Sequence, residues 1–128
     1  MIRRLDISVV HAKEGEVSLQ LKPHEGLRNP LGLIAGGAIA TLLDTALAWA
    51  CDTCVPSGKV STTIELKVNF LRPVSVSGGT VVATARVIHA GNRILVATAD
   101  LRQMDIDGAQ ARNCAVATAT CMIIPATG

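Results

Sequence analysis

The segment of residues 36–55 is the feature that most restricts how this chain can fold, because it is apolar almost throughout. It approaches the length of a membrane span, but Asp44 lies near its centre and Asp52 near its end. A carboxylate costs about 3 kcal/mol at the middle of a bilayer, so we expect no membrane span. Strong helix formers over residues 38–51, opened by a glycine pair, instead predict one long helix. A helix that is apolar nearly all round must be enclosed by the rest of the protein.

The second half of the chain supplies strands that can enclose this helix. Residues 60–70 alternate with a period of two, which predicts a strand. One face would carry Val60, Ile64, Leu66, Val68 and Phe70, and the other Ser61, Thr63, Glu65, Lys67 and Asn69. Residues 80–89, 93–104 and 111–124 repeat the pattern between turns, and we expect consecutive antiparallel strands. Residues 2–11 and 16–21 predict a hairpin that precedes the helix.

We therefore predict an α+β fold in which a strongly curved antiparallel sheet of five to six strands holds one central helix. Many alanines share one face of the later strands, and such small side chains allow a helix to approach closely. The 128 residues suffice for one core and contain no linker or repeat, so we expect a single domain over residues 1–128.

The scarcity of charge predicts self-association. Charged residues make up 17% of the chain and the mean hydropathy is +0.42, so a lone domain would have too few polar side chains to cover its surface. We expect a homo-oligomer. Lysines and arginines are scattered singly and Trp49 and Phe70 are the only aromatic residues, which argues against nucleic-acid binding. Charges at Arg3, Arg4 and Asp6 do not fit a secretory signal, and we expect a cytoplasmic protein.

The four cysteines allow a metal or redox interpretation, which we favour less. Cys51 and Cys54 form a C-x-x-C pair at the end of the predicted helix, whereas Cys114 and Cys121 stand seven apart and should face opposite sides of a strand. A zinc site needs two close pairs of ligands. We interpret the cysteines as small apolar residues of the core and expect no metal.

Asp44 is the residue most suited to chemistry. No lysine or arginine stands at a neighbouring helical position, so its carboxylate should be poorly solvated and able to act as a general base or acid. The structural alternative is a hydrogen bond to Thr41 or to a backbone amide at an interface. Two turns upstream, the amides of Gly36 and Gly37 could hold a carbonyl oxygen that gains negative charge. Equally, the glycines could serve only a tight turn.

Motifs in residues 29–73 match those of a known family in order and spacing. They comprise Asn29, Pro30, Leu31, Gly32, Leu33, Ile34, Ala35, Gly36 and Gly37, then Asp44, then Thr63, Ile64, Glu65 and Leu66, and finally Asn69, Phe70, Leu71, Arg72 and Pro73. The chain thereby resembles the hotdog-fold acyl-coenzyme A thioesterases of the phenylacetic acid degradation, or PaaI-like, type. This resemblance implies a hotdog fold and dimers whose two sheets join, often assembled further into tetramers.

The resemblance also implies an active site at the dimer interface. In the family, an asparagine and a glycine amide of one subunit polarise the thioester carbonyl, and an acid on the partner's helix drives hydrolysis. These roles fall on Asn29, Gly36 and Asp44. Thr63 matches a position where a hydroxyl assists the acid or positions water, although an ordinary strand threonine is an equal alternative. The implied substrate is an acyl-coenzyme A, with no cofactor.

Candidate substrate contacts are Gly37, Arg72, Gly91 and Arg93. Both arginines stand where predicted strands end, and basic residues at such positions in the family suit the phosphates of coenzyme A. A solvated surface arginine is the alternative interpretation for each.

Ala35 departs from the family motif, which usually has histidine at this position. None of His11, His24 and His89 stands near it in the sequence. Losing one donor beside an oxyanion typically costs ~10²- to 10³-fold in rate, so we expect a slow or differently tuned thioesterase with Asp44 as nucleophile or general base. The alternative is a non-catalytic protein that binds or senses acyl-coenzyme A. A hotdog dehydratase is disfavoured because no histidine stands at the predicted helix start.

Overall fold

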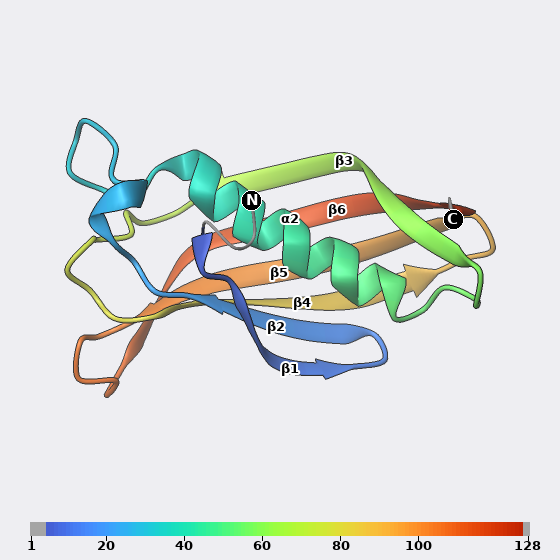
Figure 1. The fold of residues 1–128 in the computed structure, drawn as a ribbon, viewed down its shortest axis with the longest axis horizontal. Coiled ribbons are helices and arrows are strands. Elements are labelled where there is room, and N and C mark those ends of the chain that lie inside the picture. The colour runs from blue at the N-terminus through green and yellow to red at the C-terminus, as the bar shows by residue number, and fades with distance from the viewer. Residues whose placement is uncertain (1–4, 127–128) are drawn as a thin grey trace.

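One long helix lies in the curve of a six-stranded antiparallel sheet in the computed structural model, which describes residues 5–126 (Figure 1). The helix, α2, spans Gly36–Asp52. The strands are β1 (Ser8–Lys13), β2 (Glu16–Leu21), β3 (Lys59–Phe70), β4 (Val81–Ala90), β5 (Ile94–Met104) and β6 (Ala111–Pro125). A short 3-10 helix, η1 (Glu25–Leu27), follows β2. The predicted α+β architecture with a curved sheet around one helix is confirmed.

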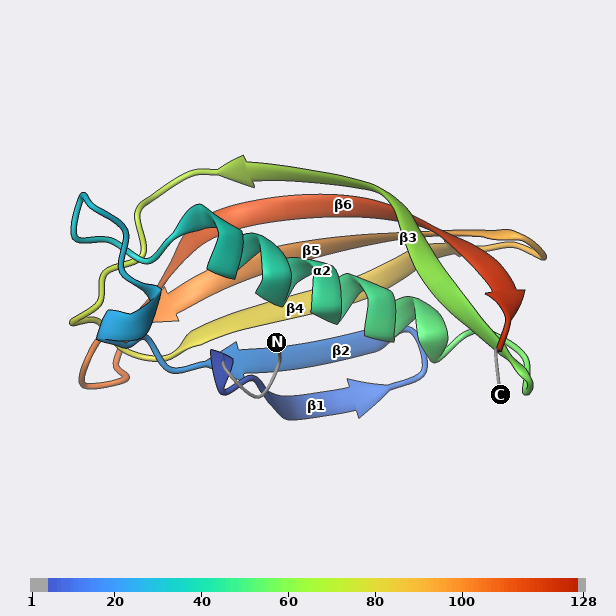
Figure 2. The same ribbon diagram turned by 45° about the horizontal axis from the view of Figure 1, so that its top comes forward.

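The strand order is β1-β2-β4-β5-β6-β3, so β1 and β3 form the two edges of the sheet. Strands β4, β5 and β6 pair in chain order, as predicted for consecutive strands. Strand β3 differs, because it pairs with β6 and the loop of residues 71–80 carries the chain across to β4. Figure 2 shows β3 running beside α2 on one side while β1 and β2 lie on the other.

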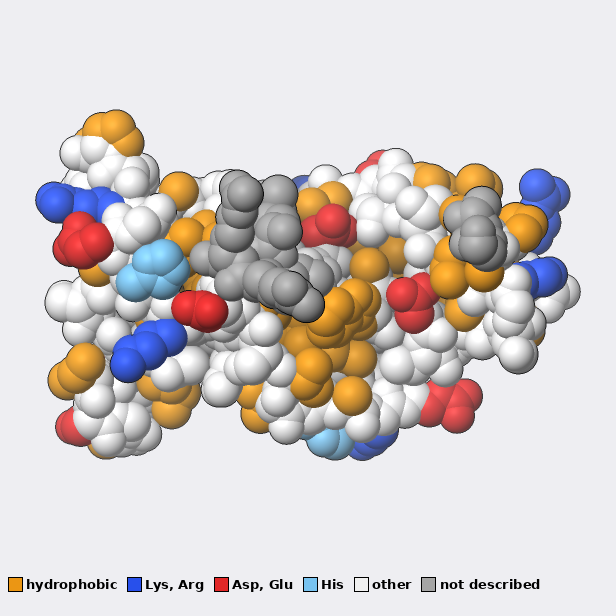
Figure 3. All heavy atoms as spheres, viewed as in Figure 1, with side chains coloured by type: hydrophobic (Ala, Val, Ile, Leu, Met, Phe, Trp, Pro, Cys, Tyr) orange, Lys and Arg blue, Asp and Glu red, His pale blue; other side chains and the backbone are white. Residues whose placement is uncertain are grey.

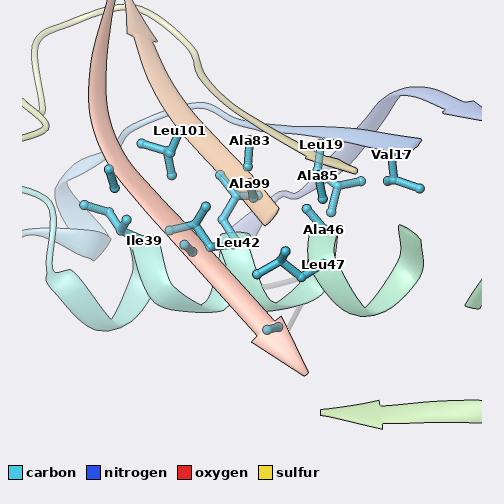
Figure 4. Packing of buried hydrophobic residues seen from close by; sticks show 14 of the residues in the cluster. Val17, Leu19, Ile39, Leu42, Ala46, Leu47, Ala83, Ala85, Ala99 and Leu101 are labelled. Carbon is cyan, nitrogen blue, oxygen red and sulfur yellow. The ribbon is translucent and has the colours of Figure 1, made fainter. Parts of the chain in front are cut away.

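The helix packs closely on the sheet because the inner face of the sheet consists largely of alanines. Leu42 and Leu47 of α2 are fully buried and point at this face (Figure 4). The buried alanines are Ala83, Ala85, Ala97, Ala99, Ala115, Ala117 and Ala119. Burying one leucine stabilises a fold by roughly 1.5–3 kcal/mol, so these contacts provide much of the driving force.

The element boundaries agree with the predictions to within a few residues, except at the N-terminus. The predicted first strand began at Ile2, but β1 begins at Ser8. Residues 2–4 lie outside the described part of the chain. The helix begins at Gly36, so both glycines belong to it rather than to a preceding turn.

A β-bulge in β3 overturns the predicted pattern of its two faces. Thr63 pairs with Cys121 and Glu65 with Thr120, which leaves Ile64 as the extra residue. Directly paired residues share a face, so Thr63 lies on the inner face with Cys121, and Leu66 lies on the same inner face with Ala119. The strict alternation predicted for residues 60–70 put Thr63 and Leu66 on opposite faces. The bulge therefore turns hydroxyl side chains toward the helix before Ile64 and apolar ones after it.

The cysteines behave as core residues. Cys51, Cys114 and Cys121 are buried, Cys54 is half-buried, and all four thiols are free. Cys114 and Cys121 are predicted to face opposite sides of β6, but the side chains of both are buried. The register of β6 with β5 shifts at Cys114, since Leu101 pairs with Ala115 and Arg102 with Asn113.

On the helix side of the molecule, hydrophobic side chains gather over the centre and charged side chains lie singly (Figure 3). Lysine and arginine side chains of the described residues form no continuous basic tract on this face. Within residues 5–126, none of the helices combines the length and the apolar character needed to cross a bilayer.

Candidate active site

Asp44 faces β3 from the middle of α2. Its side chain is half-buried, and its Oδ1 accepts a hydrogen bond of 2.8 Å from Oγ1 of Thr63. The Thr41 hydroxyl donates instead to the Gly37 carbonyl oxygen at 2.8 Å, so the alternative in which Asp44 bonds to Thr41 is wrong. Asp44 and Thr63, both singled out from the sequence, thus form one unit between helix and edge strand.

Asp52, the last residue of α2, forms a similar pair with β3. Oδ1 of Asp52 accepts hydrogen bonds of 2.8 Å from both the backbone N–H and the hydroxyl of Ser61. Sequence reasoning missed this pair, although Ser61 and Thr63 stand two apart on one strand and both acids belong to the predicted helix segment. Oδ1 of Asp52 thus binds both the backbone and the side chain of Ser61, and this contact anchors the end of α2 to β3.

The start of α2 presents unpaired backbone amides. Ala35 is the N-cap residue, and its side chain makes no capping hydrogen bond. The N–H groups of Ala38 and Ile39 donate to the Ala35 carbonyl oxygen, whereas those of Gly36 and Gly37 have no acceptor within residues 5–126. Free amides at a helix start carry partial positive charge, so they favour an anionic oxygen.

Asn29 is held in a fixed orientation beside this helix start. Its Oδ1 accepts hydrogen bonds from the backbone N–H groups of Leu31 at 2.9 Å and Leu33 at 3.0 Å. Because a backbone N–H can only donate, the oxygen must face the loop and the Nδ2 amino group must face away from it. Nδ2 has no partner among the described residues and is available as a donor.

Asn29 and Gly36 line the same groove, which has a volume of about 260 Å³. Its other lining residues are Leu33, Ile34, Ile39, Phe70, Leu71, Arg72, Pro73 and Val74. A Cβ atom added at Gly36 would lie 3.4 Å from Cζ of Phe70, so the aromatic ring sits directly against the glycine. Sequence reasoning did not assign Phe70 to the site, because strict alternation gave no reason to place it beside the helix start.

The predicted substrate contacts are distributed over both ends of the molecule. Arg72 lines the groove, and its guanidinium donates to the Asn113 carbonyl oxygen at 3.2 Å. Gly37 is exposed at the helix start, where nothing lies within 4 Å of a Cβ position. Gly91 and Arg93 lie in the turn between β4 and β5, at the end of the sheet opposite the groove (Figure 1). One chain therefore brings Arg72 to Asn29 and Gly36, but not Gly91 or Arg93.

Asp44 is also separated from the groove within one chain. Asp44 stands eight positions after Gly36 on α2, which corresponds to about 12 Å along a helix axis. Neither Asp44 nor Thr63 lines the groove that contains Asn29 and Gly36. The four predicted catalytic residues thus form two half-sites, one at the start of α2 and one at its middle.

The thiol of Cys121 lies just behind the Asp44–Thr63 pair. Its Sγ is 3.9 Å from Oγ1 of Thr63, and on its other side it contacts Cys51. The hydrogen bond with Cys121 and burial both raise the pKa of the Cys51 thiol, so Cys51 is the protonated donor of this contact. The same hydrogen bond lowers the pKa of the Cys121 thiol to about 7. The two thiols lie on the inner side of the Asp44 half-site.

A larger hollow of about 600 Å³ lies on the far side of the loop of residues 71–80. Lys22, Asp105 and Asp107 contribute charged side chains to it, but none of the predicted site residues lines it. No cluster of three or more potential metal ligands occurs within residues 5–126. The two half-sites along α2 are thus the candidate active site.

A long helix held in a curved antiparallel sheet, with free amides at its start and an acid in its middle, defines a protein of the hotdog class. The family model of the thioesterase superfamily matches residues 31–109. The chain belongs to this superfamily.

Curated relatives share nearly three quarters of the chain. A putative esterase of Halobacterium salinarum is 37% identical over 98 residues, which cover 73% of this chain and 63% of that protein. Acyl-coenzyme A thioesterase PaaI of Escherichia coli is 30% identical over 91 residues, covering 71% of this chain and 62% of PaaI. The chain thus spans a little less than two thirds of the length of these relatives. The resemblance to PaaI-like proteins is confirmed.

Solved structures share the fold over almost the whole chain. A thioesterase family protein of Silicibacter pomeroyi superposes with a TM-score of 0.90 at 29% identity, covering 98% of this chain and 89% of that protein. Because the superposition includes β1 to β6, the hotdog fold extends beyond the residues matched by the family model.

Proposed function

We propose that this chain is an acyl-coenzyme A thioesterase, which releases a free acid and coenzyme A and works as a homo-oligomer. Membership of the thioesterase superfamily supports the reaction type. The observation that carries the proposal is the Asp44–Thr63 pair. One carboxylate oxygen of Asp44 accepts from the Thr63 hydroxyl, and the other has no partner within residues 5–126. A half-buried carboxylate with one free oxygen on an apolar helix is suited to proton transfer or to attack on a carbonyl carbon.

The separation of the half-sites supports a site shared between two copies. Reacting atoms must approach to about 3–3.5 Å, whereas Gly36 and Asp44 of one helix are about 12 Å apart. Asp44 of one copy would therefore act on a thioester held by Asn29 and Gly36 of another. The edge strand β3 is a suitable seam, because it has no strand partner beyond β6 in the described sheet and exposes Ile64 and Phe70 by 53% and 55%.

In the water-mediated form of this mechanism, Asp44 takes a proton as the oxygen of a water molecule bonds to the thioester carbon. The carbonyl oxygen becomes an anion and accepts hydrogen bonds from the Gly36 N–H and from Nδ2 of Asn29. The carbon–sulfur bond then breaks, and the proton on Asp44 passes to the leaving thiolate. In the nucleophilic form, the Asp44 carboxylate itself bonds to the carbon, the thiolate leaves, and water hydrolyses the resulting anhydride.

The remaining contacts have roles in the same proposal. Arg72 at the groove wall would bind phosphate groups of coenzyme A, and Gly37 would lie beside the bound thioester with its free amide. Gly91 and Arg93, at the opposite end of the sheet, would reach the same ligand only from another copy, as Asp44 would.

Thiol release from aryl, short-chain and long-chain acyl-coenzyme A substrates tests this proposal. We expect turnover with at least one class, and a loss of about 10²- to 10⁴-fold in kcat for Asp44→Asn, because the amide cannot accept a proton or attack carbon. Asp52→Asn is a matched control on the same helix, also bonded to a β3 hydroxyl, and should stay within about threefold of the parent rate. No thiol release from any substrate, or an undiminished rate in Asp44→Asn, would refute the mechanism.

A non-catalytic acyl-coenzyme A binding protein is the second candidate, favoured by one observation. The Ala35 side chain makes no hydrogen bond at the helix start, so the oxyanion position is served by backbone donors and Asn29 alone. Calorimetry distinguishes the two functions: stoichiometric binding of acyl-coenzyme A without product would support the binding protein over the enzyme.

A further inference from the structure

Gln103 is a fully buried polar side chain that sequence reasoning did not single out. It lies on the inner face of β5, following the buried Leu101 on that face, and is 1% exposed. A buried amide without partners is destabilising, so its hydrogen bonds indicate why it is tolerated. Ser18 is the other buried polar side chain among residues 5–126, and its hydroxyl bonds to that of Thr84 across two strands.

All three hydrogen bonds of Gln103 go to the backbone of the loop between β3 and β4. Its Oε1 accepts from the Ser75 N–H at 3.0 Å. Its Nε2 donates to the carbonyl oxygens of Ser75 at 2.9 Å and Gly79 at 3.2 Å. The side chain therefore bonds to the N–H and the carbonyl oxygen of Ser75 and also to the carbonyl oxygen of Gly79 near the end of the loop.

The glycine pair in this loop fits the same contact. A Cβ atom at Gly78 would collide with the Gln103 carboxamide. A Cβ atom at Gly79 would lie 2.6 Å from the Met104 carbonyl oxygen. The two glycines therefore let the loop pack directly on β5.

The loop held by Gln103 in turn holds the segment that leads into α2. Leu33 and Ser75 form an antiparallel bridge, and the Ile34 N–H donates to the Val74 carbonyl oxygen at 3.0 Å. Ile34 is two residues before Gly36, and the N-cap Ala35 has no side-chain bond of its own. The direction of the Gly36 N–H thus depends on the backbone contacts of residues 33–35.

We propose that Gln103 is a positioning residue for thioester hydrolysis, which fixes the direction of the Gly36 N–H through Ser75 and the 33–35 segment. This inference rests on the proposed function, in which that N–H binds the oxyanion. Gln103 touches no substrate. A displacement of about 1 Å in such a donor can cost on the order of 10²-fold in rate while binding of the ground state changes little.

The test compares Gln103→Met, which keeps the size of the side chain and loses its hydrogen bonds, with Leu19→Ala. Leu19 is buried in β2 and pairs with Ala83, away from the loop, so its truncation lowers stability without touching the 33–35 segment. We expect kcat of Gln103→Met to fall about tenfold or more with KM within about threefold, and kcat of Leu19→Ala to stay near that of the parent. Equal kcat in the two variants at temperatures where both are folded would overturn the proposal.

A second readout does not need activity. In ¹⁵N-labelled protein, the amide resonances of Gly36 and Gly37 should shift in Gln103→Met and remain in place in Leu19→Ala. Gly78→Ala displaces the Gln103 carboxamide without removing it, and should move the same resonances if Gln103→Met does not fold. Resonances that stay in place in the folded Gln103 or Gly78 variant would refute the positioning role, whereas absent turnover in the parent protein would refute the proposed function alone.

Discussion

At the scale of single residues, Asp44 combines partial burial with an incomplete set of hydrogen bonds. The Thr63 hydroxyl donates to one carboxylate oxygen at 2.8 Å, and this contact sets the orientation of the other oxygen. Asp52, eight residues further on, has a backbone and a hydroxyl donor on one oxygen and anchors the helix. The same residue type thus has two roles on one helix, set by what β3 presents to each.

Gly36→Pro tests the oxyanion donor. Proline removes the N–H but is tolerated at the first position of a helix, and Ala35 already has φ −59° and ψ 138°, a conformation compatible with a following proline. We expect kcat to fall about 10²- to 10³-fold with a melting temperature near that of the parent. Gly36→Ala keeps the N–H and adds a methyl group against Phe70, and should lose much less activity. Similar losses in both variants would show that bulk, not the missing donor, matters.

Sequence reasoning found the residue that a local pattern marks, and it missed those whose role depends on strand register or on contacts distant in the sequence. Asp44 stands out because burying an unpaired charge on an apolar helix costs folding free energy, so such a residue indicates a partner or a function. Its partner Thr63 could be named from a family resemblance but not from alternation, since the bulge at Ile64 decides which side chains face inward. Gln103 was missed because its partners are backbone groups of a loop 24 to 28 residues away.

At the scale of elements, the close packing of α2 on alanines holds the two half-sites in place. Ala97→Leu would force a larger side chain between helix and sheet, and overpacking of this kind costs about 1–3 kcal/mol of unfolding free energy. Thr98→Val, on the outer face of the same strand, should change stability by less than about 0.5 kcal/mol. Urea unfolding of both variants measures the difference. Equal stabilities would mean that the helix does not pack as closely as described.

The arrangement of elements was predictable where local pattern decides it and not where long-range pairing does. Alternation predicted the positions of β4, β5 and β6, and apolar helix formers predicted α2. The pairing of β3 with β6 depends on the loop of residues 71–80 crossing the sheet, which no local period indicates. The bulges at Ile64 and Cys114 likewise arise from the register between strands.

At the scale of the whole molecule, the apolar composition and the open edge of β3 support self-association through that edge. Ile64→Asp would place a charge on the seam, and we expect it to convert the oligomer to a folded monomer. Ile88→Asp is the matched control, because Ile88 is 63% exposed on β4, away from β3. Light scattering after size exclusion gives the mass of each variant, and an unchanged mass for Ile64→Asp would place the seam elsewhere.

Subunit complementation tests the central claim, a site shared between copies, most directly. Asp44→Asn and Gly36→Pro protomers would each be inactive alone, but a mixed dimer would contain one site with both residues intact. Random mixing of equal amounts should restore about a quarter of the parent activity, because half of the dimers are mixed and each has one intact site. Mixed dimers that form, as shown by native mass spectrometry, yet recover no activity would contradict the shared site.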